Sequence, residues 1–200
     1  MRPEISAKRL MARVFALGEI GALEGGGVCR LALTDADRAG RDWLVAEMEA
    51  LGLSVSIDAI GNIWGIRPGA QDGPPVMIGS HIDSVATGGL YDGALGVLSG
   101  LEVVAALNAA GMQTQRPVAV AAFTNEEGAR FAPDMMGSGV HQGALDLDEM
   151  LATRATDGSA VVGEELERIG YRGTAASIIP AAYLELHVEQ GPVLEQEGIR

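Results

Sequence analysis

The chain of 200 residues contains one cysteine, Cys29, so an internal disulfide is impossible and a reducing compartment, the cytoplasm, is expected. Basic residues are also few, with 14 Lys and Arg against 27 Asp and Glu, which leaves a net charge of −13. Because a surface this negative repels phosphate groups, nucleic acid is not expected as a partner.

Long apolar runs are missing as well. The longest, residues 94–110, contains Glu102 and Asn108 and is bracketed by glycines, which predicts a buried helix and no association with a membrane. The N-terminal residues carry charges and lack the apolar stretch of a signal peptide. Aromatic residues make up only 4%, but 48% of the residues are hydrophobic, which is enough for a sizeable core of mostly small side chains.

Periodic patterns of apolar residues predict alternating helices and strands. Helices are expected at residues 5–20, 34–51, 93–110 and 160–169, with Thr34 and Asp92 as caps of the second and third. Strands are expected at residues 53–58, 63–66, 76–79, 118–123 and 181–186. Residues 128–158 are expected to be irregular apart from a helical turn near 148–152. This alternation predicts a three-layer α/β/α fold with a mixed, largely parallel sheet covered on both faces.

Polar residues of ligand type follow the predicted strands. His81, the pair Glu126-Glu127 and His187 each come at the end of an apolar strand, and Asp92 stands at the start of a helix. Because ligands of open α/β sheets bind at the carboxyl ends of the strands, these side chains are expected to share one rim. Taken singly, each has an ordinary alternative: a core histidine, a helix cap, a solvated acidic loop or a surface histidine.

The chemistry of this set indicates a metal site. Asp83 lies two residues after His81, so on an extended backbone both side chains face the same way and Asp83 could hold the ring. The adjacent carboxylates of Glu126 and Glu127 repel each other, and burial raises the pKa of one of them. A nearby dication would relieve this repulsion. One carboxylate could then bind metal while the other takes a proton from water. Histidine and carboxylate ligands suit Zn²⁺, and also Mn²⁺, Co²⁺ or Ni²⁺.

Longer motifs surround these residues. They are Gly26-Gly27-Val28-x-Arg30-Leu31, Gly79-Ser80-His81-x-Asp83, Gly88-Gly89-x-Tyr91-Asp92-Gly93, Asn125-Glu126-Glu127-Gly128 and His187-x-Glu189-Gln190-Gly191-Pro192. Together they resemble metallopeptidase family M20, in its amidase branch of N-carbamoyl-L-amino-acid hydrolases, β-ureidopropionases and allantoate amidohydrolases. The last motif is typical of this branch and not of M20 peptidases. The resemblance implies a zinc-exopeptidase-like domain.

The resemblance also implies roles at this rim. Four residues would be ligands of two divalent metal ions: His81, Asp92, Glu127 and His187. Asp92 would bridge the two ions, and Glu126 would be the general base and then the acid toward the leaving nitrogen. Asp83 would support His81, and Gln190 would contact the substrate. His141, in the segment expected to be irregular, is no evident further ligand.

Members of the family are about twice as long as this chain. The resemblance therefore implies that residues 1–200 are the N-terminal portion of a discontinuous catalytic domain, without its lid and dimerisation domain and its C-terminal catalytic segment. The expected function of the whole protein, a homodimer, is metal-dependent cleavage of a linear C–N bond in an N-carbamoyl amino acid or a ureido compound such as allantoate. The alternatives are an inactive remnant that only binds metal, which this chain alone is expected to be, and an M20 aminoacylase or peptidase.

Overall fold

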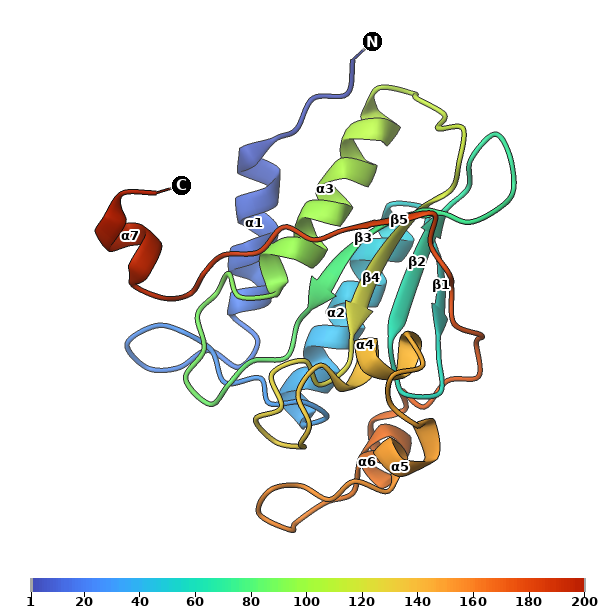
Figure 1. Ribbon diagram of the computed structural model, residues 1–200. Helices are drawn as coiled ribbons and strands as arrows, with labels where there is room; N and C mark the ends of the chain where they lie inside the picture. The colour runs from blue at the N-terminus through green and yellow to red at the C-terminus, as the bar shows by residue number, and fades with distance from the viewer. Residues whose placement is uncertain (1, 200) are drawn as a thin grey trace.

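The structure, a computed structural model, describes residues 2–199 and is built around one sheet (Figure 1). Its five strands are β1 (Ser54–Ile57), β2 (Ile63–Arg67), β3 (Val76–His81), β4 (Val118–Phe123) and β5 (Ala182–Leu184). They lie in the order β1-β2-β4-β3-β5. The pairs β1–β2 and β2–β4 are antiparallel, and the pairs β4–β3 and β3–β5 are parallel. The predicted mixed sheet is confirmed, with both kinds of pairing equally represented.

Helices lie on both faces of the sheet. They are α1 (Ala7–Gly18), α2 (Asp35–Ala50), α3 (Ala94–Ala109), α4 (Met136–His141), α5 (Leu147–Leu151), α6 (Val162–Ile169) and α7 (Val193–Glu197). Helix α3 packs on β3 and β4, α2 packs on β1 and β2, and α1 packs against α3 on the same side (Figure 1). On the opposite face, His141 of α4 lies against the rings of Trp64 and Phe123. The α/β architecture is therefore as expected.

Several boundaries differ from the sequence-based expectation. The segment 128–158, expected to be irregular apart from one turn, contains both α4 and α5. Strand β5 covers only Ala182–Leu184, so His187 stands three residues beyond the strand and not directly at its end. Thr34 does cap α2, since its hydroxyl accepts a hydrogen bond from the amide of Asp37 at 3.3 Å.

The predicted cap of α3 is wrong. The N-cap residue is Gly93, with φ of 60°, and it makes no side-chain capping bond. The carboxylate of Asp92 faces the side chains of His187 and Gln190 instead. Helix α3 itself has 16 residues and is largely buried, as expected. Among residues 2–199, no helix is both long and apolar enough to cross a membrane.

A buried carboxylate joins α1 to α3. The side chain of Glu102 is 1% exposed and pairs with Arg9 at 2.7 Å and with Arg13 at 3.5 Å. It also accepts a hydrogen bond from the amide of Ser6 at 2.6 Å. Removing this carboxylate takes the ion-pair partner from Arg9, leaves Arg13 with Glu47 alone, and leaves the Ser6 amide without its acceptor. Loss of a buried charged partner is one of the costly single changes in a folded protein.

We therefore expect Glu102→Ala to lower the free energy of unfolding by about 3 kcal/mol. The matched control is Glu167→Ala, which removes an exposed carboxylate paired with Arg172 and should cost less than about 1 kcal/mol. Urea unfolding followed by circular dichroism measures both. Equal effects of the two variants would show that the ion pairs of Glu102 contribute no more to the free energy of unfolding than a surface pair does.

Candidate metal centre

Three residues of ligand type meet beside the start of α3. They are His81 at the end of β3, Asp92 just before α3, and His187 beyond β5, and one ligand atom from each lies within 4.8 Å of the others. His81 is buried, Asp92 is half-buried and His187 is exposed. The Nε2 atom of His187 lies 3.3 Å from Oδ1 of Asp92, and the two imidazole rings are stacked with centroids 6.0 Å apart. The three residues predicted to hold one metal ion thus converge from segments far apart in the sequence.

Backbone carbonyls fix which ring nitrogen points toward the site. Nδ1 of His81 lies 2.9 Å from the carbonyl oxygen of Asp83, and Nδ1 of His187 lies 2.7 Å from that of Val188. Because a carbonyl can only accept, each Nδ1 must carry the proton, and each neutral ring then offers an unprotonated Nε2. An outer hydrogen bond of this kind is the usual way in which a metal-binding histidine is held.

Glycine is required where the chain passes the ring of His81. Gly93 has a left-handed φ of 60°, and a Cβ atom there would overlap the His81 ring. We expect Gly93→Ala to displace the ring and to weaken zinc binding about tenfold or more, since small shifts in outer support already cost that much. The matched control is Gly111→Ala at the other end of α3, which has the same φ of 60° but no atom within 4 Å of the added Cβ.

Isothermal titration with Zn²⁺ compares the two glycine variants. Loss of zinc affinity in Gly93→Ala alone is the expected outcome. Equal losses in both variants would mean that backbone strain at α3, and not contact with His81, determines the effect.

Asp83 supports the site in a different way from the one expected. Its carbonyl oxygen holds the His81 ring, whereas its carboxylate lies 3.9 Å from Nδ1, too far for a hydrogen bond. The buried carboxylate instead accepts the backbone amides of Glu126 at 3.2 Å and Glu127 at 3.3 Å. Asp83 therefore ties the end of β3 to the turn that follows β4.

The two glutamates after β4 reach the site from this turn. Oε2 of Glu126 lies 3.3 Å from Nε2 of His81. Burial raises the pKa of both Glu126 and Glu127, and the negative charges of Asp83 and Asp92 raise it further. Burial opposes the charged form of His81, but the carboxylates of Asp83 and Glu126 outweigh this effect, so the pKa of His81 is raised. The centre is thus a cluster of carboxylates and histidines whose negative charge favours a bound cation.

Glu127 stands apart from the three-residue group. Its Oε1 atom is buried and has no hydrogen-bond partner within residues 2–199. A buried carboxylate oxygen without a donor is costly, so a cation or donor facing it would be stabilising. This orphaned oxygen, together with the His, Asp and His donors, fits the ligand chemistry of a divalent metal centre.

Gln190 also lies at the site, with its amide Nε2 donating to Oδ2 of Asp92 at 2.7 Å. Its backbone φ is 50°, and Gly89 leaves the room that its side chain occupies. Gln190 therefore holds the second oxygen of the central carboxylate. Its contact with a substrate stays a prediction.

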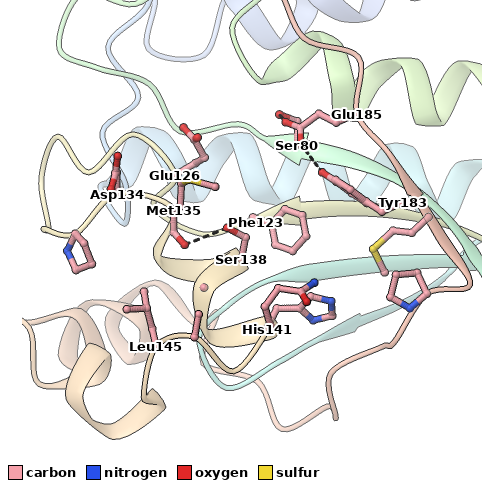
Figure 2. A pocket seen from close by; sticks show the side chains of 16 residues that line it. Ser80, Phe123, Glu126, Asp134, Met135, Ser138, His141, Leu145, Tyr183 and Glu185 are labelled. Atoms are coloured by element: carbon pink, nitrogen blue, oxygen red, sulfur yellow. Dashed lines mark hydrogen bonds between the residues drawn. The ribbon is translucent and has the colours of Figure 1, made fainter.

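A cavity of about 590 Å³ opens next to Glu126 on the face of the sheet opposite to α3 (Figure 2). Phe123 and His141 line it together with Tyr183, whose hydroxyl donates to Glu185 at 2.7 Å. His141 lines this cavity and lies outside the group of His81, Asp92 and His187. The cavity was not predicted from the sequence. The sequence pattern that could have indicated it is the set of apolar side chains on one face of the strands, such as Met77 and Phe123.

Comparison with protein families identifies the family to which these residues belong. The profile of peptidase family M28 matches residues 62–177, a range that includes His81, Asp92, Glu126 and Glu127 and ends before His187. The M20 label that the motifs suggested is therefore not confirmed by the family comparison. The matched range covers more than half of the chain.

Relatives and solved structures bear out the resemblance to amidohydrolases. The N-carbamoyl-L-amino-acid amidohydrolase of Rhizobium meliloti is 44% identical over 197 residues, which are 97% of this chain and 47% of that protein. The ureidoglycolate hydrolase of Arabidopsis thaliana is 34% identical over 206 residues, 98% of this chain and 43% of that protein. The crystal structure of a hydantoinase/carbamoylase family amidase from Burkholderia ambifaria superposes with a TM-score of 0.91 and 48% identity, over 98% of this chain and 48% of that one. The chain spans about half the length of the relatives that it matches.

Proposed function

Because the chain belongs to peptidase family M28, we propose that it forms the metal-binding part of an amidohydrolase that cleaves a linear C–N bond. The substrate class proposed is N-carbamoyl-L-amino acids, with ureido acids such as ureidoglycolate or allantoate as the second choice. The observation that carries the proposal is the convergence of His81, Asp92 and His187 beside the carboxylate of Glu126. The names of the relatives support the choice of a C–N bond outside a peptide.

The cofactor proposed is a pair of divalent ions, with Zn²⁺ favoured and Mn²⁺, Co²⁺ or Ni²⁺ as alternatives. His81, Asp92 and His187 would hold one ion. Glu127, whose Oε1 lacks a donor, would hold the second together with Asp92. When bound, such ions supply Lewis acidity, which polarises a substrate carbonyl and makes water a stronger acid.

The side chains supply proton transfer and orientation. Glu126, with its raised pKa, accepts the proton of the attacking water and delivers it to the leaving nitrogen. Asp83 holds the backbone of Glu126 in reach of the site. Gln190 orients the carboxylate of Asp92 and, in the proposed complex, contacts the polar end of the substrate.

Metal binding and turnover test the proposal in one experiment. The chain is titrated calorimetrically with Zn²⁺, Mn²⁺ and Co²⁺, and the whole protein is incubated with N-carbamoyl-L-alanine while released alanine and ammonia are measured. Saturable metal binding by the chain and metal-dependent release of alanine by the whole protein are the expected results, since the chain alone is expected to be inactive. Absence of metal binding would refute the proposal, whereas a whole protein that binds metal but releases no alanine supports the alternative of a remnant that only binds metal.

A peptidase is the second candidate, and the name of the matching family favours it. Assaying the same metal-loaded protein with Ala-Ala beside N-carbamoyl-L-alanine separates the two candidates, since a peptidase releases alanine from the dipeptide at the higher rate. For the whole protein, we further propose a homodimer, and the single Cys29 fits the cytoplasm as its location.

A further inference from the structure

A buried arginine outside the metal centre is connected to it through the backbone. Arg30, in the glycine-rich motif that has no role above, is only 3% exposed. Its guanidinium donates from Nε to the carbonyl of Ile82 at 2.6 Å and from Nη1 to the carbonyls of Leu17 at 3.1 Å and Ile20 at 2.8 Å. Arg30 thus joins the C-terminal end of α1 to the residue that directly follows His81.

The backbone of Arg30 makes a second connection to the same segment. Its amide donates to Oγ of Ser84 at 2.8 Å, and its carbonyl accepts the amide of Ser84 at 2.9 Å. Residues 82–84, which we term the connector, are therefore fixed to Arg30 at both ends. Asp83 lies between the two fixed points.

The connector determines where Asp83 presents its oxygens. The carbonyl of Asp83 holds the ring of His81, and its carboxylate accepts the amides of Glu126 and Glu127. We propose that Arg30 is a positioning residue for the metal centre, which it controls by fixing the connector and, through Asp83, both the His81 ring and the Glu126-Glu127 turn. This inference rests on the proposed function of the centre.

The site is built for an arginine. Three carbonyls lie around one guanidinium, whose planar fork donates in several fixed directions, whereas a lysine ammonium is a compact charge on a flexible stem. Helix α2 makes room for it, since a Cβ atom at Gly40 would lie 2.8 Å from Cδ of Arg30. A residue that only capped α1 would not need the contact with Ile82.

Amide hydrogen exchange in metal-free protein tests the inference directly. In Arg30→Met we expect the amides of Glu126 and Glu127 to exchange about tenfold faster or more, as they do in Asp83→Ala. The double variant should show no further increase, because both changes act through one connector. Arg13→Met is the control, since Arg13 pairs with Glu47 and Glu102 and lies outside the connector contacts. It should leave the two exchange rates unchanged.

Unchanged exchange of the Glu126 and Glu127 amides in Arg30→Met would overturn the inference and leave Arg30 as a cap of α1. If Arg30→Met does not fold, Ser84→Ala, which removes the hydroxyl acceptor of the Arg30 amide, should raise the same two exchange rates. Unchanged exchange of the Glu126 and Glu127 amides in a folded Ser84→Ala would then overturn the inference.

Zinc titration separates the inference from the function on which it rests. We expect the Zn²⁺ dissociation constant of Arg30→Met to rise about ten- to a hundredfold, as for loss of other outer support, with partial rescue in Arg30→Lys. If the unmodified chain binds no zinc but the exchange rates respond, the proposed function fails and the positioning role stands. If zinc binds and neither exchange nor affinity responds, the positioning role alone fails.

Discussion

In the whole protein, replacing Glu126 by glutamine is expected to lower kcat for N-carbamoyl-L-alanine by about 10²–10⁴-fold, the usual contribution of a general base. Glutamine keeps the size of the side chain but cannot accept the proton of the attacking water. The Oε2 atom that lies 3.3 Å from Nε2 of His81 is the group concerned. Because Glu126 is not part of the His81, Asp92 and His187 group, zinc affinity should change little. Parallel measurement of kcat and of the zinc dissociation constant checks both statements.

The matched control for this change is Glu185→Gln. Glu185 lines the same cavity as Glu126 and accepts hydrogen bonds from Ser80 and Tyr183 (Figure 2). Within residues 2–199 it forms no hydrogen bond or ion pair with His81. A loss of kcat confined to Glu126→Gln supports a proton-transfer role. Similar losses in both variants would instead point to the general charge of the cavity and would contradict the assignment.

Strand-end reasoning succeeded where the strand lies inside the sheet. Strand β3 lies between β4 and β5 and pairs with β4 as far as His81, so its end is well defined and His81 falls on the rim as predicted. His187 was placed by the same reasoning, but β5 is an exposed edge strand of three residues. Its approach to Asp92 comes from the path of the chain beyond β5, which local periodicity does not encode.

The role of Asp92 shows a second limit of prediction from the sequence. Asp is a favoured cap, so local propensity predicted a capping bond at α3. In the structure its two oxygens face His187 and Gln190, which lie 95 and 98 positions away in the sequence. Tertiary packing decides whether Asp92 caps the helix or faces these distant partners. A short stretch of sequence around Asp92 does not contain this information.

The short helix α4 was missed for a different reason. It begins after Met135, whose φ of 51° lies in the left-handed region, and it contains two glycines in six residues. Such a segment has low helix propensity and no apolar period, so an irregular segment was the reasonable prediction. The helix is stabilised by tertiary contacts, with Gly137 packed so closely against the end of β4 that its amide donates to the carbonyl of Thr124 at 2.8 Å.

Loss of the His81 ring is expected to have the largest effect on metal binding. His81→Ala should weaken Zn²⁺ affinity by more than about a hundredfold, because a change in the outer partner of a ligand already costs about ten- to a hundredfold. The ring is 1% exposed, and it is fixed by the carbonyl of Asp83 and by the close approach of Gly93.

The chain offers a matched control in its third histidine. His141 packs against Trp64 and Phe123 outside the metal centre, so His141→Ala should leave zinc affinity unchanged. Since a ligand that binds only the folded state raises the melting temperature, Zn²⁺ should raise it in the unmodified chain and in His141→Ala but not in His81→Ala. Equal stabilisation of all three proteins by zinc would place the bound ion elsewhere and would remove the basis for a hydrolytic centre at the end of β3.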